Sequence, residues 1–196
     1  MASRLSIVPD PRFESLAPAL AERLSAVTAS ITPDNFASLT DALFLEVLRR
    51  GVEEVGGDEA TIWLPDSAGE HLVPACNTGS RAGDFVGVFR QALSSGLVSL
   101  VFATEQPMLI NAAHADPRHS PLADRALGQR TEALIAVPFS FLRSGRGVLS
   151  CVRLAAGVGG EFEPGHLGRM QRTSVLLGRL VEHRVLGETV AWSAHT

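Results

Sequence analysis

The chain has 196 residues, of which 45% are hydrophobic and 19% are charged, and its formal net charge is −4. This composition excludes a disordered chain, and the net charge gives no general attraction to nucleic acid. No apolar run is long enough to cross a bilayer, and residues 1–11 lack the apolar region of a signal peptide. We therefore expect a cytoplasmic protein that binds neither nucleic acid nor membrane.

The first two predicted elements are helices. In the first, apolar residues recur at three- and four-residue steps and share one helical face: Phe13, Leu16, Leu20, Leu24 and Val27. Pro18 lies inside this stretch, so the helix either kinks there or begins near it. The second helix is expected to begin at Thr32-Pro33-Asp34, where Thr32 can cap it, and to end near Gly56-Gly57.

A hairpin and two short helices are predicted next. Residues 59–64 and 71–76 are strand-like and flank a turn at residues 65–69. Asp84 is suited to cap a helix that holds Phe85, Val88, Phe89 and Leu93, and a second helix is expected over residues 97–104.

The second half of the chain is predicted to supply three more strands and a long helix. Residues 108–111 form a short strand, and residues 112–130 form a polar loop with a helical turn near 122–127. The strands 133–141 and 147–154 are almost continuously apolar, which indicates that both faces of the sheet are covered. The final helix is expected to start at Glu163-Pro164.

The stretch from Gly96 to Gly157 carries the most distinctive pattern of the chain. A short apolar helix, a short strand, a polar turn and two longer strands follow one another at residues 96–104, 106–111, 116–118, 131–138 and 147–154. This order resembles the ligand-sensing core of a GAF domain, and the resemblance extends roughly from Phe36 to Leu186. It lacks an invariant catalytic triplet, so it indicates a fold more strongly than a function.

The resemblance implies an α/β fold of the α+β type. It has a five- to six-stranded antiparallel sheet, with terminal helices on one face and loops plus short helices on the other. It also implies that any small-molecule pocket lies between the sheet and the loop-rich face, under the 112–130 loop. The ligand-binding candidates that follow are Phe85, Phe89, Gly96, Leu97, Ile110, Asn111, His114 and Arg118.

Several candidates have alternative interpretations that the sequence leaves open. Asn111 can donate and accept hydrogen bonds to a ligand, or it can simply end its strand and cap a turn. Arg118 suits an anionic ligand group, but a salt bridge to Asp116 or Asp124 is favoured. His114, Asp116 and His119 could supply metal ligands, but solvated loop residues are the favoured interpretation, and we expect neither a metal nor another cofactor.

The two cysteines carry the only enzymatic alternative. One GAF-like family reduces free methionine sulfoxide with paired cysteines, but this chain does not show that cysteine set. In the sheet order that the resemblance implies, one strand separates Cys76 from Cys151, which is too far for a disulfide without backbone movement. The 112–130 loop has no cysteine, so covalent attachment of a bilin there is not expected.

We therefore expect a non-enzymatic regulatory domain that binds an unknown small molecule and signals through a homodimer of its terminal helices. The alternatives are a ligand-free module for dimerisation or partner binding, and a thiol-dependent methionine sulfoxide reductase. The expected divisions are a helical extension at 1–31, the domain at 32–188 and a tail at 189–196. The predicted dimer stripes are Leu16-Leu20-Leu24-Val27 and Leu177-Leu180-Val181, and the output is expected in a separate protein or a longer chain.

Overall fold

The computed structural model describes residues 15–157 and 160–193, so Phe13 of the first predicted helix lies outside the described residues. Its centre is a six-stranded antiparallel sheet in the order β3-β2-β1-β6-β5-β4. The strands are β1 (Glu59–Pro65), β2 (His71–Asn77), β3 (Gln91–Ala92), β4 (Met108–Asn111), β5 (Thr131–Phe141) and β6 (Gly145–Leu154). This sheet confirms the predicted fold class.

Two long strands form the middle of the sheet. β5 and β6 pair as a hairpin from Thr131↔Leu154 to Phe141↔Gly145, and β1 pairs with the other edge of β6. Most residues of these strands are buried, because helices cover both faces of the sheet. The almost continuous apolar runs in the sequence therefore predict the sheet interior correctly.

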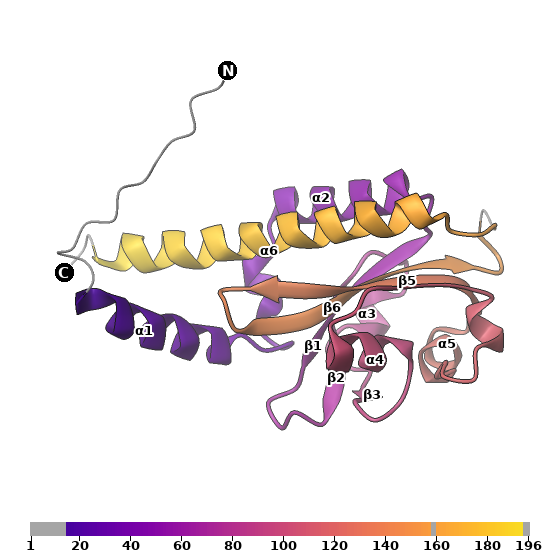
Figure 1. Cartoon of the computed structure of the whole chain (residues 1–196), viewed down its shortest axis with the longest axis horizontal. Coiled ribbons are helices and arrows are strands. Elements are labelled where there is room, and N and C mark those ends of the chain that lie inside the picture. The colour runs from indigo at the N-terminus through magenta and orange to yellow at the C-terminus, as the bar shows by residue number, and fades with distance from the viewer. Residues whose placement is uncertain (1–14, 158–159, 194–196) are drawn as a thin grey trace, which may run out of the picture.

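One face of the sheet, which we call the helix face, is covered by long helices (Figure 1). They are α2 (Ala42–Glu54) and α6 (Pro164–Ser193), with α1 (Ala17–Ser30) packed beside the end of the β5–β6 hairpin. The core on this side is one large apolar cluster, and its large buried side chains include Phe36, Phe44, Phe139, Phe141, Met170 and Leu177.

The opposite face, which we call the cavity face, is covered by short elements and loops (Figure 1). These are α3 (Ala82–Phe85), α4 (Leu97–Thr104), the 3₁₀ turn η3 (Ala113–Ala115) and α5 (Leu122–Leu127). A smaller apolar cluster lies beneath them and includes Trp63, Phe85, Leu97 and Leu127. The predicted short helix after residue 96 and the turn near 122–127 are therefore confirmed.

The helix predicted to begin at Thr32 is wrong in its start. Residues 36–39 form the 3₁₀ helix η2, and α2 begins only at Ala42. Asn35 turns the chain, because its side chain accepts from the Thr32 backbone N–H at 2.8 Å and donates to the Ser30 carbonyl at 2.7 Å. Asp41 then caps α2 by accepting from the Phe44 N–H at 2.9 Å.

The helix predicted from Asp84 to Leu93 is also wrong, since α3 ends at Phe85 and the chain re-enters the sheet as β3. Gly87 has a φ of +73°, and its N–H donates to the Pro74 carbonyl at 2.9 Å. The backbone of Val86 is already extended and ends α3, and the left-handed Gly87 then turns the chain toward β3.

The terminal helices use much of their apolar surface inside the core. Leu177 and Val181 of α6 are fully buried, and Leu180 is partly buried against the same cluster. The predicted dimer stripe on α6 is therefore wrong, because its residues pack on the sheet. Within residues 164–187, the part of α6 whose side chains are described, the large exposed apolar residues are instead Val175, Leu176 and Leu186.

Candidate functional site

A cavity of about 70 Å³ lies between the cavity face of the sheet and the short helices. Strands β1, β2, β5 and β6 form its base, while α4, α5 and the segment before α5 form its sides. Its polar lining residues are Glu59, Thr61, Asn77, Gln91, His119, Ser120, Asp124, Gln129, Thr131 and Ser150. A small space with several polar groups in an apolar surround is the usual form of a ligand site.

Strand alternation places three alternate side chains of β1 in this cavity. Glu59, Thr61 and Trp63 all line it, whereas Ala60 and Ile62 belong to the core on the helix face. Such alternation follows from the two-residue period of a strand. The polar residues Glu59 and Thr61, alternating with apolar ones, are therefore a pattern in the sequence that points to this face of β1.

The polar groups at the base are held by hydrogen bonds between neighbouring strands. The Trp63 indole N–H donates to the Ser150 hydroxyl at 2.9 Å, and the Asn77 amide donates to the Thr61 hydroxyl at 2.9 Å. The Asn77 carbonyl oxygen in turn accepts from the Gly79 N–H at 2.8 Å. These contacts fix the side chains before any ligand arrives, which lowers the entropic cost of binding.

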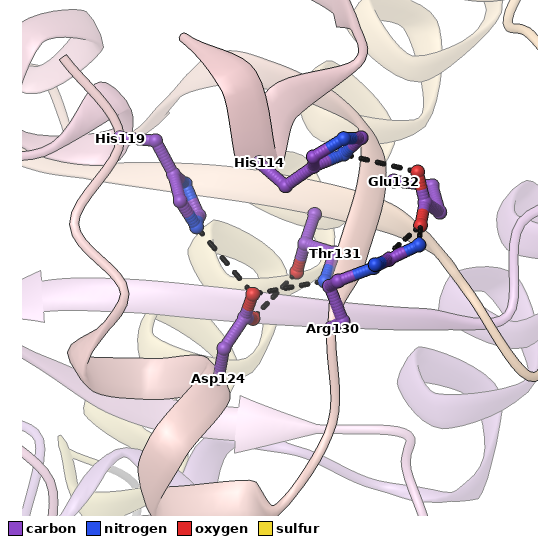
Figure 2. A network of polar contacts seen from close by, with 6 residues as sticks. All are labelled: His114, His119, Asp124, Arg130, Thr131 and Glu132. Carbon is purple, nitrogen blue, oxygen red and sulfur yellow. Dashed lines mark hydrogen bonds and ion pairs between the residues drawn. The ribbon is translucent and has the colours of Figure 1, made fainter. Parts of the chain in front are cut away.

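A histidine and an aspartate from the loop and α5 form one side of the cavity (Figure 2). The Asp124 carboxylate accepts from the Thr131 hydroxyl at 2.7 Å and from the Thr131 N–H at 2.9 Å. Its Oδ2 atom lies 3.4 Å from His119 Nε2. Among the described side chains, within residues 15–157 and 160–187, His119 Nε2 is the one buried side-chain nitrogen or oxygen that makes no hydrogen bond. The site therefore contains a buried nitrogen that faces a carboxylate but makes no hydrogen bond.

Glu59 is the most perturbed acid of the cavity. Burial raises the pKa of this carboxyl, its hydrogen bond with Gln129 opposes that rise, and the nearby charge of Asp58 adds to it. Among the described residues no arginine or histidine forms an ion pair with Glu59. A partly buried carboxylate without a counter-charge is costly in free energy, and such groups gather at functional sites.

The start of α4 closes the cavity on another side. Gly96 has a φ of +92°, and a Cβ there would lie 3.1 Å from Gln91 Nε2 and 3.2 Å from Ser120 Cβ. The Gln91 amide donates to the Ser95 carbonyl at 2.8 Å, which holds the turn. Glycine is required at this position both for its backbone conformation and for the close approach of two segments.

Three of the residues proposed from the sequence line the cavity, namely Phe85, Gly96 and Leu97. Phe89 does not line it but stacks on Phe85 with ring centroids 5.1 Å apart. Ile110 packs against the same apolar cluster without reaching the cavity. All five residues therefore lie on the cavity face, and Phe89 and Ile110 pack against the apolar cluster without lining the cavity.

The other three proposed residues have partners elsewhere. The Asn111 amide donates to the Phe162 carbonyl at 3.1 Å, and its oxygen accepts from the Phe162 N–H at 2.9 Å. Asn111 therefore ties β4 to the segment that leads into α6. His114 lies 3.0 Å from Glu132, which also pairs with Arg130 (Figure 2).

Arg118 forms a two-point ion pair with Asp116, at 2.9 Å and 2.7 Å, and hydrogen bonds from Arg118 lower the pKa of Asp116 to about 2. Arg118 lines an open outer groove rather than the cavity. Gly96, His119 and Ser120 line both spaces, so they separate the groove from the cavity.

The two cysteines are buried, and β1 separates their strands. Burial raises the pKa of the Cys76 thiol to about 11 and that of the Cys151 thiol to about 12. Neither residue lines the cavity. The part of the chain that the structure describes contains no group of three or more side chains suited to a metal ion, and none of its helices has the length and apolar content to span a membrane.

The fold and the cavity define an antiparallel α+β domain with a small cavity between its sheet and its short helices. The chain belongs to the GAF domain family, whose model matches residues 40–180. GAF domains are generally regulatory or sensory. A comparison with curated protein sequences finds no significant match.

Solved structures with the same fold are similar to this chain at low sequence identity. The GAF domain/HD domain protein from Geobacter sulfurreducens has a TM-score of 0.59 and 16% identity, covering 76% of this chain and 97% of its own. The GAF-B domain of DevS from Mycobacterium smegmatis has a TM-score of 0.54 and 15% identity, covering 80% and 98%. A free methionine-R-sulfoxide reductase from Neisseria meningitidis, in complex with its substrate, has a TM-score of 0.53 and 18% identity, covering 95% and 98%.

Proposed function

We propose that this chain is a non-enzymatic sensor domain that binds a small molecule in the cavity and transmits binding through its terminal helices. The observation that carries the proposal is the cavity itself, because it combines fixed polar groups, an uncompensated carboxylate and an unused histidine nitrogen. A site that served only packing would be expected to exclude such groups, since each costs stability when it lacks a partner.

The β5–β6 hairpin offers a physical connection between the cavity and the terminal helices. Thr131 at the start of β5 bonds to Asp124 in the cavity side. At the other end of the hairpin, the Leu142 carbonyl accepts from Thr28 of α1 at 3.2 Å, and the Leu142 N–H donates to Glu182 of α6 at 3.1 Å. A shift of α5 on ligand binding would therefore act on a strand that both terminal helices hold.

Exposed apolar side chains on these helices support a homodimer. Leu16 and Leu20 on the α1 side are 56% and 57% exposed, and Val175 and Leu176 on α6 are 58% and 46% exposed. In Figure 1, α1 and the C-terminal half of α6 extend past the end of the β5–β6 hairpin. Apolar surface that the domain does not cover itself is typical of an assembly interface. The proposed partner is a second copy of this chain, with a separate output protein beyond it.

The alternative of a methionine sulfoxide reductase has one observation in its favour, the fold shared with the Neisseria enzyme. The chemistry of this chain favours the sensor instead. A thiol reductase needs a reactive thiolate and a resolving thiol within reach. Here both thiols are buried, both have raised pKa values, and a strand separates them.

Native mass spectrometry tests the sensor proposal. Protein purified without denaturation is measured directly and again after equilibration with a small-molecule extract of cells. We expect a stoichiometric small adduct in at least one preparation, and no turnover of free methionine sulfoxide with a dithiol reductant. A bare mass in both preparations would contradict the sensor. Thiol-recycled turnover that disappears in Cys76→Ser would favour the reductase.

A further inference from the structure

The charges that line the cavity restrict the class of ligand. The chain has no lysine, and none of the arginines within the residues that the structure describes lines the cavity. The ionisable residues that do line it are Glu59, Asp124 and His119. A site for phosphate or for an organic acid would be expected to present a cationic side chain such as arginine. The cavity lining instead presents two acidic side chains, Glu59 and Asp124.

The two carboxylates differ in how their oxygens are used. Asp124 is bound to Thr131 through both oxygens and faces His119, so its charge has a structural role. The one hydrogen bond that lowers the pKa of the Glu59 carboxyl comes from the side-chain amide of Gln129. Glu59 is therefore the group in the cavity that can accept hydrogen bonds from a ligand.

Gly79 provides the space that Glu59 occupies. A Cβ atom at Gly79 would collide with the Glu59 carboxyl group, and Gly79 is held by Asn77 through its N–H. The φ of Gly79 is not in the left-handed region, so a glycine is not needed there for backbone reasons. The absence of a side chain at this position keeps the carboxyl group where it lines the cavity.

The remaining surface suits a small planar cation. Trp63 and Phe85 both line the cavity and meet edge to face with ring centroids 5.6 Å apart. Aromatic rings attract cations, and a carboxylate binds two parallel N–H groups well. The cavity of about 70 Å³ has room for about five water molecules. A group of four to six non-hydrogen atoms therefore fits without rearrangement.

We propose that the cavity binds a small organic cation of the amidine, guanidine or amine class, with Glu59 as its counter-charge. This inference rests on the proposed sensor function, because it names the ligand class of the same site. Binding places a positive group beside the one carboxylate of the cavity that lacks a firm partner. The cavity should prefer a cation to a neutral molecule of the same shape, because only the cation forms an ion pair with the ionised Glu59.

Three probes of one shape and different charge test this proposal: acetamidinium, acetamide and acetate. The signal is the indole N–H of Trp63 in a ¹⁵N NMR spectrum, which Trp63→Phe distinguishes from Trp192, the only other tryptophan. Each probe is titrated to about 50 mM at constant ionic strength. That range lies far above the dissociation constant of about 0.05 mM that the best contacts allow for four non-hydrogen atoms.

We expect acetamidinium to shift the Trp63 signal with an affinity at least about tenfold above that of acetamide, and acetate to produce no saturable shift. In Glu59→Gln the acetamidinium affinity should fall about tenfold or more while the acetamide affinity stays within about threefold. Glu105→Gln, which changes an exposed glutamate paired with Arg146 outside the cavity, should bind all three as the wild type does.

Gly79→Ala provides a second variant if Glu59→Gln does not fold. It displaces the Glu59 carboxyl group without removing it, and it should also lower the acetamidinium affinity. Acetate binding as tightly as acetamidinium, or no probe shifting Trp63, would overturn the cation proposal. The adduct in native mass spectrometry is independent of these probes, so the sensor proposal stands or fails separately.

Discussion

The two faces of the sheet are built from different chemistry. On the helix face, α2 and α6 cover a continuous core whose largest members, among them Phe36, Phe139 and Leu177, are completely buried. On the cavity face, short helices cover a smaller apolar cluster and leave a space lined by polar groups. The same strands supply both sets of residues, because side chains alternate between the faces.

This difference separates stability from recognition. The helix face buries the larger of the two apolar clusters, so most of the folding free energy is expected there. On the cavity face, Glu59 has no cationic partner among the described residues and the buried His119 Nε2 makes no hydrogen bond, at a cost in stability. The comparison predicts that substitutions on the two faces will differ in kind, with large losses of stability on one and changes in binding on the other.

The largest expected effect is on the helix face. Phe139→Ala should lower the free energy of unfolding by about 3–5 kcal/mol, because it empties space at the centre of the core. Urea unfolding measures this loss. Ser150→Ala, which leaves the buried Trp63 N–H without its acceptor, should cost about 1–3 kcal/mol, less than Phe139→Ala. Equal losses in the two variants would contradict the division between the faces.

The second prediction concerns the outer surface of the terminal helices. Leu20→Asp combined with Leu176→Asp should convert a dimer to a monomer, because each change places a charge on an exposed apolar position. Light scattering at about 100 µM, above the micromolar range of weak pairs, measures the mass. Val88→Asp is the matched control, since Val88 is 68% exposed and lies after α3 on the cavity face. A monomeric wild type would refute the dimer.

The third prediction concerns Cys151, which is buried in the core of the helix face. Cys151→Ser should destabilise by about 1–3 kcal/mol, because it places a hydroxyl among apolar side chains. The native thiol should react slowly with a thiol reagent at pH 8, since burial raises its pKa to about 12. Rapid modification of folded protein at Cys151, confirmed by peptide mass, would contradict this assignment.

The smallest expected effect is the pH dependence of stability that Glu59 contributes. Its pKa is raised above the ordinary value of 4.5, mainly by burial. Between 4.5 and the raised pKa the folded protein binds more protons than the unfolded chain, so this group makes stability fall as pH rises. Glu59→Gln should therefore be at least as stable as the wild type at pH 8, with an advantage that shrinks toward pH 4.5.

Melting temperatures of wild type, Glu59→Gln and Glu105→Gln across this range measure the effect. Glu105 is exposed, so its variant should follow the wild-type curve. A Glu59→Gln curve parallel to that of the wild type would show that Glu59 is not desolvated in the folded protein.

Much of the fold can be predicted from the sequence because it depends on periodic apolar patterns. The hairpins at 59–77 and 131–154, the helix after Gly96 and the turn near Leu122 all follow from such patterns. The start of the helix predicted at residue 32 and the end of the helix predicted at residues 84–93 could not be placed, because Asn35 and the Val86-Gly87 turn redirect the chain. Local turn chemistry competes there with helix propensity.

The cavity could be predicted only in part. Phe85, Gly96 and Leu97 are apolar or small residues beside recognisable elements, and they line it. The polar lining comes from β1, β2, β6 and the α5 region, which meet only in the folded sheet. Asn111 illustrates the difficulty, since its position at a strand end suits a ligand and a structural clamp equally until Phe162 is placed beside it.

The central claim is that the ligand occupies the space between the sheet and α5, and one matched pair of variants tests it most directly. Ala123 lines the cavity, whereas Ala126 on the same helix is exposed. Ala123→Met fills the cavity and Ala126→Met does not. In native mass spectra, wild type and Ala126→Met should carry the same stoichiometric adduct, and Ala123→Met should lose it while keeping its folded charge distribution. Retention of the adduct by folded Ala123→Met at the wild-type level would contradict the account.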